Sequence, residues 1–134
     1  MLRDTIPLKE KETIKVLKRF KNTNPWFGAT RTRKAKFFYC FEKLKELYGI
    51  DTELIFKIPL DLKKWKSSHK SNYNSLTDVI TLDGRLSVIT LIHEFLHALG
   101  YDEDGAVKYS IYFFKIVFPE EFGKLKSKDK FYTR

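Results

Sequence analysis

The stretch that decides the fold, residues 78–104, reads DVITLDGRLSVITLIHEFLHALGYDED. Its first five residues, 78–82, are rich in β-branched side chains and predict a strand, which the following Asp-Gly pair ends in a turn. Ser87 is a residue type that caps helices, and an apolar run of helical length follows it and stops at Gly100. We therefore expect a helix over residues 88–99.

On either side of this stretch, apolar residues at helical spacing and boundaries marked by Pro or Gly predict further helices and strands. The expected elements are helices over residues 7–21, 34–48 and 105–118 and a strand over residues 52–58. Residues 22–33 and 59–77 are interpreted as loops because they contain Pro, Gly or many polar residues. Helices mixed with a few short strands predict an α+β fold with a small mixed sheet.

The chain has 134 residues, of which 43% are hydrophobic, so it can bury the core of one compact domain. We expect a single domain over residues 1–134, with an N-terminal helix and loop in residues 1–33 and a charged tail in residues 120–134. The longest apolar stretches fall short of the roughly 20 residues that span a bilayer, and no signal peptide is visible at the N-terminus. The expected location is therefore intracellular, in the cytoplasm.

The net charge of +9 is distributed unevenly. Residues 1–70 carry 18 basic and 8 acidic side chains, whereas residues 71–134 carry 8 and 9. A basic front half is a candidate surface for nucleic acid. A lysine-rich, solvated surface explains the same charge, because the basic residues alternate with apolar ones.

A metal-binding pattern lies inside the predicted helix 88–99. His93 and His97 are four residues apart, so both rings project from one helical face and can bind the same metal ion. Glu94, next to the first histidine, is placed to act as a general base on water that a zinc ion activates. The pattern His-Glu-x-x-His therefore predicts a Zn²⁺ hydrolase, with two surface histidines as the structural alternative.

The third metal ligand is predicted just beyond the helix. Gly100 lets the chain turn back, which places Glu103 and Asp104 six and seven residues after His97. Glu103 is the expected ligand, because two histidines and one glutamate form a known catalytic zinc set. Asp104 is the alternative ligand, a partner that orients a histidine ring, or the N-cap of the next helix.

This segment resembles two known families over about a dozen residues. It is similar to the HExxHxxGxxH pattern of the metzincin metallopeptidases, with Glu103 in place of the third histidine, although the methionine turn is absent because Met1 is the only methionine. It also resembles the H-x-x-x-H-x-x-G-Y-D-H stretch of the bacterial rRNA-maturation endonucleases, matched here by residues 93, 97 and 100–102. That family has a small residue where this chain has Glu94, and a histidine where it has Glu103.

The order strand, turn, HExxH helix and second helix looks like the minimal zincin domain of small metallopeptidases. The resemblance implies an edge strand ahead of the metal helix, to which an extended peptide substrate adds. The residues expected in that strand are Val79, Ile80, Thr81 and Leu82. Tyr101 and Tyr109 are candidates to stabilise the transition state, with aromatic packing as the alternative for each. His69, in the polar loop, is interpreted as a solvated residue; the alternatives are that it orients substrate or serves as an alternative ligand.

Three functions follow from these observations. Hydrolysis of peptide bonds by zinc and Glu94 is the leading expectation, with a peptide or protein as substrate. A metal-dependent endoribonuclease is the alternative that fits the basic residues 1–70. A catalytically inactive zincin that serves as a binding module is the third.

Overall fold

The structure is a computed structural model that describes residues 4–57 and 71–127. These residues contain five helices and three strands. The helices are α1 (Glu10–Asn22), α2 (Thr30–Tyr48), α3 (Val88–Ala98), α4 (Glu103–Val117) and α5 (Pro119–Ser127). The strands are β1 (Glu53–Lys57), β2 (Asn72–Asn74) and β3 (Val79–Asp83). The mixed α+β architecture expected from the sequence is confirmed.

The sheet is small and mixed, with strand order β1-β3-β2. β3 pairs in parallel with β1, where Glu53 lies opposite Val79, and antiparallel with β2, where Tyr73 lies opposite Ile80. The strand expected before the metal helix is therefore present, but it is the central strand of the three. The expectation that Val79, Ile80, Thr81 and Leu82 form a substrate-binding edge is wrong, because hydrogen bonds to two neighbours occupy both sides of β3.

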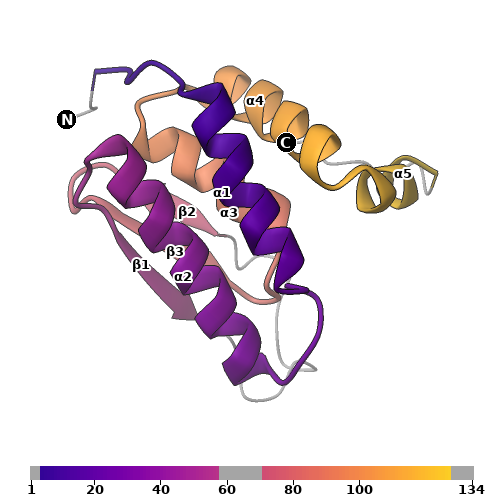
Figure 1. The fold of residues 1–134 in the computed structure, drawn as a ribbon. Coiled ribbons are helices and arrows are strands. Elements are labelled where there is room, and N and C mark those ends of the chain that lie inside the picture. Colours follow the sequence, from indigo (N-terminus) through magenta and orange to yellow (C-terminus); the bar gives the residue numbers. More distant parts are fainter. Residues whose placement is uncertain (1–3, 58–70, 128–134) are drawn as a thin grey trace.

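Helices cover one face of this sheet. α2 packs against β1, and α3 packs against β2 and β3, while α1 lies beside α2 (Figure 1). Leu54, Ile80 and Leu82 are buried, whereas Ile55, the next residue along β1, is 45% exposed. This alternation along the strands is what a sheet with one covered face requires.

α3 is the central helix of the molecule, because nine of its eleven residues are buried. Its Phe95 packs against the rings of Phe41 and Tyr48 on α2, with ring centroids 6.1 and 5.7 Å apart. On its other side α3 packs against α4. Side chains on α3 are consequently held by neighbours on several sides, which gives any site on this helix a rigid base.

Two predicted helix boundaries are wrong by several residues. α1 begins at Glu10 and not at Pro7, because the preceding segment hydrogen-bonds elsewhere: the Ile6 N–H donates to the Leu99 carbonyl at 2.8 Å. α2 begins at Thr30 and not at residue 34. Its first turn is fixed by Arg33, whose Nε donates to the Pro25 carbonyl at 2.8 Å and folds the preceding loop onto the helix.

Two other segments also differ from expectation. The predicted loop 59–77 contains β2, and the predicted charged tail 120–134 begins with α5. Pro119 and two acidic residues in the first turn favour the start of a helix there. Residues 58–70, with His69, and residues 128–134 lie outside the described part of the chain. None of the described helices is both long enough and apolar enough to cross a membrane.

Candidate metal centre

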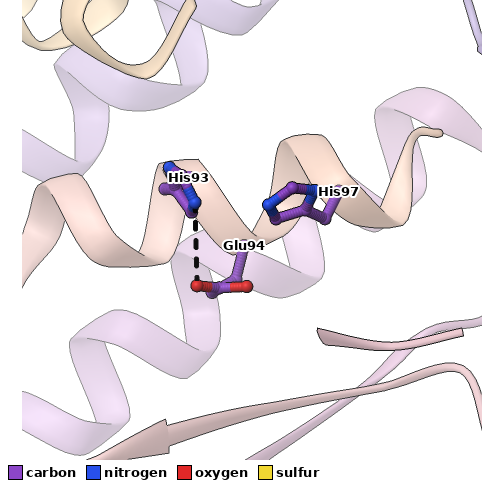
Figure 2. A group of neighbouring side chains, drawn as sticks. All are labelled: His93, Glu94 and His97. Atoms are coloured by element: carbon purple, nitrogen blue, oxygen red, sulfur yellow. Dashed lines mark ion pairs between the residues drawn. The ribbon is translucent and has the colours of Figure 1, made fainter. Parts of the chain in front are cut away.

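The HExxH segment forms the second half of α3, as the sequence predicts. The Ser87 hydroxyl accepts a hydrogen bond from the Thr90 N–H at 3.3 Å, which confirms the expected N-cap. The helix brings His93 and His97 one turn apart, with ring centroids 4.8 Å from each other (Figure 2). The two imidazoles therefore face the same space beside α3.

Glu94 lies beside the first histidine and is buried with it. The relative exposure is 0% for His93 and 3% for Glu94. One carboxylate oxygen of Glu94 lies 4.0 Å from His93 Nε2, the contact drawn in Figure 2. His93, Glu94 and His97 offer ligand atoms that all lie within 4.8 Å of one another, close enough to hold a metal ion. Because burying ionisable groups is costly, their concentration on this helix calls for a compensating partner.

Glu103 lies close to both histidines, and it lies nearer to His93 than Glu94 does. Its Oε1 lies 3.2 Å from His93 Nε2 and 3.0 Å from His97 Nε2. Ligand atoms at zinc bond lengths of about 2.0–2.1 Å in a tetrahedral site are separated by about 3.3 Å. The Glu103 oxygen and the two ring nitrogens therefore already have nearly the spacing of three ligands around one ion, with Glu94 slightly further out.

A turn after α3 delivers Glu103 to this position. Gly100 adopts a φ of +99°, and its N–H donates to the His97 carbonyl at 2.9 Å. The Tyr101 N–H donates to the Leu96 carbonyl at 3.1 Å. This is the Schellman arrangement, in which a glycine with positive φ reverses the chain directly after a helix. α4 then begins at Glu103, three residues beyond the glycine.

The same turn determines the orientation of the His97 ring and which of its two nitrogens carries the proton. Its Nδ1 lies 2.9 Å from the Tyr101 carbonyl, and because a carbonyl only accepts, Nδ1 is the donor of this bond. In the neutral ring Nε2 then carries the lone pair. That lone pair faces the Glu103 carboxylate at 3.0 Å, so a proton or a metal cation must lie between the two acceptors. A carbonyl that holds the distal nitrogen is also the usual support of a metal-binding histidine.

Asp104 does not reach this centre. It is exposed and is not among the side chains that line the pocket of His93 and His97. The interpretation of Asp104 as a helix N-cap is also wrong, because Asp102 is the cap: its Oδ1 accepts from the Gly105 N–H at 2.8 Å. The helix starts two residues earlier than expected, and the cap position moves with it.

The pocket beside the histidines has a volume of about 250 Å³. Glu94, Tyr101 and Glu103 line it together with the two histidines, and its other wall consists of Ser71, Asn72, Tyr73 and Ser75. This second wall comes from β2 and its flanks. The sequence does not predict β2, because a strand of three residues with one tyrosine between two asparagines carries too weak an alternation. The structure therefore places β2, and not β3, alongside the candidate centre.

β2 is held in place through its tyrosine. The Tyr73 hydroxyl donates to Asp78 Oδ1 at 2.7 Å, and the same oxygen accepts from the Thr52 hydroxyl at 2.7 Å. Asp78 has a φ of +57°, an uncommon conformation for a residue other than glycine. These bonds link the starts of β1 and β3 to β2, and so fix the wall of the pocket.

The two tyrosines proposed as transition-state stabilisers have other contacts. The Tyr101 hydroxyl donates to the Ile6 carbonyl at 3.0 Å, although the side chain lines the pocket. Burial raises the pKa of Tyr101, and the neighbouring phenols of Tyr109 and Tyr48 raise it further, so the hydroxyl stays protonated and can donate. Tyr109 packs edge-on against the Tyr101 ring at 5.5 Å and is not part of the pocket lining. The arrangement gives both rings a packing role.

The chain matches no protein-family model, no curated protein and no solved structure. Its chemistry must therefore be inferred from the pocket itself. Two histidines and two glutamates converge there, one glutamate at ligand spacing from both rings and the other buried beside the first ring. Such a set can hold a divalent cation and keep one carboxylate available for proton transfer.

Proposed function

We propose that this protein is a zinc-dependent metallopeptidase with a minimal zincin-like fold. His93, His97 and Glu103 are the metal ligands, and Glu94 is the general base. The observation that carries the proposal is the convergence of Glu103 Oε1 on both ring nitrogens, at 3.2 and 3.0 Å.

The donor set favours zinc among the common divalent ions. Two neutral imidazoles and one carboxylate are typical catalytic zinc ligands, whereas magnesium and calcium prefer oxygen-only sites. Three protein ligands leave a fourth coordination position, and the adjoining pocket of about 250 Å³ gives a substrate access to it. Zinc held there would polarise the carbonyl of the substrate and lower the pKa of water.

Glu94 carries the proton in this mechanism. Its carboxylate takes a proton from the attacking water as the new C–O bond forms at the peptide carbon. The same group then delivers that proton to the amide nitrogen as the C–N bond breaks, so the amine leaves neutral. The burial of Glu94, 3% exposed, keeps bulk water from competing for this proton.

The position of β2 supports a peptide as substrate. β2 is the outer strand on its side of the described sheet, and its residues line the pocket. An outer strand offers main-chain N–H and C=O groups to an extended peptide, which would then lie across the metal centre. The edge role expected for the strand before α3 is thus proposed for β2.

The polarity of the pocket favours a peptidase over the endoribonuclease alternative. Among residues 4–57 and 71–127, the side chains that line the pocket include two carboxylates and no lysine or arginine. A nuclease pocket would be expected to supply cationic side chains for the phosphates of its substrate. The basic residues of the front half remain a candidate surface for nucleic acid outside the pocket.

The decisive experiment compares wild type with Glu94→Gln. Zinc content is measured on the purified proteins, and cleavage is followed on a peptide library and on RNA. We expect wild type to hold one zinc ion and to cleave peptides. Loss of the base should lower peptide kcat/KM by about 10²–10⁴-fold without loss of zinc.

Asp104→Asn is the matched control, because it also neutralises a carboxylate near the centre but outside the pocket. It should retain full activity. Peptide cleavage by Glu94→Gln at the wild-type rate would contradict the proposed role of Glu94 as the general base. Zinc binding without any cleavage of peptide would instead support the third function, an inactive zincin that binds partners, and cleavage of RNA alone would support the nuclease.

A further inference from the structure

The segment ahead of α1 is hydrogen-bonded to the turn that follows the HExxH helix. The Ile6 N–H donates to the Leu99 carbonyl at 2.8 Å, and the Thr5 hydroxyl donates to the Gly100 carbonyl at 3.1 Å. In the opposite direction, the Tyr101 hydroxyl donates to the Ile6 carbonyl at 3.0 Å. Three successive residues of the turn are thus bonded to two residues that are about 95 positions away in the sequence. We call Thr5 and Ile6 the N-terminal brace.

The brace is itself anchored at its other end. The Lys9 N–H donates to the Tyr48 hydroxyl at 2.9 Å, and that hydroxyl is 2.6 Å from the Thr13 hydroxyl on α1. The side chains of Ile6 and Leu8 are partly buried and pack against the core. The segment from the brace to Lys9 is therefore held at both ends, by Tyr48 on α2 and by the turn after α3.

Tyr101 connects the brace to the metal centre. Its side chain is held by Ile6, and its main-chain carbonyl accepts the hydrogen bond from His97 Nδ1. Because the carbonyl determines which ring nitrogen of His97 carries the proton, a displaced Tyr101 would leave that choice and the ring orientation unfixed. The turn also leads directly into Glu103, so its position affects two of the three proposed ligands.

We propose that the N-terminal brace is a positioning element for the metal centre, and that releasing it lowers the zinc affinity. The inference rests on the metal site of the proposed function. Removal of a group that orients a ligand typically lowers metal affinity 10–100-fold. The brace acts one step further from the metal, so we expect about fivefold for Tyr101→Phe, and about tenfold or more when Thr5→Val is added.

The test measures Zn²⁺ affinity by competition with a chelating indicator in the full chain. Tyr101→Phe removes only the hydroxyl that holds Ile6, and Thr5→Val removes only the hydroxyl that holds Gly100. Tyr109→Phe is the matched control, because it removes a neighbouring phenol that has no part in the brace. Thermal unfolding shows that each variant is folded. The visible spectrum of the Co²⁺-loaded proteins reports whether the geometry of the metal ligands changes. A loss of overall stability alone would not alter this spectrum.

We expect weaker zinc binding and an altered Co²⁺ spectrum for Thr5→Val and Tyr101→Phe, the larger effect for the double variant, and no change for Tyr109→Phe. Amide hydrogen exchange at Gly100 and Tyr101 should accelerate in the same order. If wild type binds zinc and the double variant binds it equally well, the brace has no positioning role while the proposed function stands. If wild type binds no zinc, both proposals are wrong.

Discussion

Two helix pairs in this molecule enclose space in different ways. α1 and α2, joined by residues 23–29, border a cavity of about 460 Å³ whose lining is mainly apolar, with Phe20 and Cys40 as buried members. α3 and the start of α4, joined by residues 99–102, form one wall of the pocket of about 250 Å³ that contains the histidines, and β2 with its flanks forms the other. Among the described residues, the side chains that line the larger cavity include the cations Arg19, Lys36 and Lys43 but no histidine and no carboxylate. The smaller pocket is lined by two histidines and two glutamates, and both glutamates lie within 4.0 Å of His93 Nε2.

This difference shows that the candidate site is identified by the side chains that line a cavity and not by the volume of the cavity. Apolar side chains around the α1–α2 cavity are what helix packing leaves behind, and their burial stabilises the fold. Burial of His93 and Glu94 costs free energy unless a partner compensates for it. Ionisable side chains buried in a central helix are therefore expected to have a chemical role that an apolar side chain cannot supply. The two helix pairs should therefore respond in opposite ways to substitution.

The largest expected effect is on stability and belongs to the α1–α2 pair. Phe37→Ala removes a ring of α2 that is 0% exposed and packs edge-on against Phe20 of α1 at 5.2 Å, and such a truncation lowers the free energy of unfolding by about 3–5 kcal/mol. The zinc affinity of the molecules that remain folded should stay as in wild type. Urea unfolding and zinc competition measure the two quantities separately. If a folded Phe37→Ala protein bound zinc much more weakly, the α1–α2 pair could not be separated from the metal centre in this way.

The next effect belongs to the α3–α4 pair. Structural zinc sites with four ligands bind with about 10–16 kcal/mol, or about 3–4 kcal/mol for each ligand, so His93→Ala should lower zinc affinity by about 10²–10³-fold. Peptide cleavage should be lost with the metal. His69→Ala is the control, since it removes the one histidine of the chain that lies outside the HExxH segment. Equal losses of zinc from both variants would place the metal elsewhere.

A smaller effect tests the assignment of the third ligand. Glu103→Gln should weaken zinc binding by about 10–100-fold, because an amide replaces the charged oxygen that lies close to both ring nitrogens. Asp104→Asn, one residue away and exposed, should change the affinity less than about twofold, as expected for a surface charge. The same competition titration measures both. A larger loss for Asp104→Asn would reverse the assignment and would require α4 to start differently.

Much of the candidate centre was predicted from local sequence. The i, i+4 spacing of His93 and His97 places their rings together on any α-helix, and Ser87 and Gly100 mark the ends of that helix. Glu103 was predicted over Asp104 as the third ligand; of the two, Glu103 lines the pocket beside both rings, and its binding of a metal stays a prediction. These predictions succeeded because hydrogen bonds within a helix and at its ends join residues only a few positions apart.

The sequence by itself therefore determined α3, its caps and the side chains that share its face, since all of these depend on the helical repeat. Tertiary structure decided that β3 is central, that β2 forms the pocket wall, and that Asp102 and not Asp104 caps α4. It also decided that Thr5 and Ile6 reach the turn beside His97, which moved the start of α1 to Glu10. Each of these depends on which distant main-chain and side-chain groups pair, and such pairings have no periodic signature in the chain.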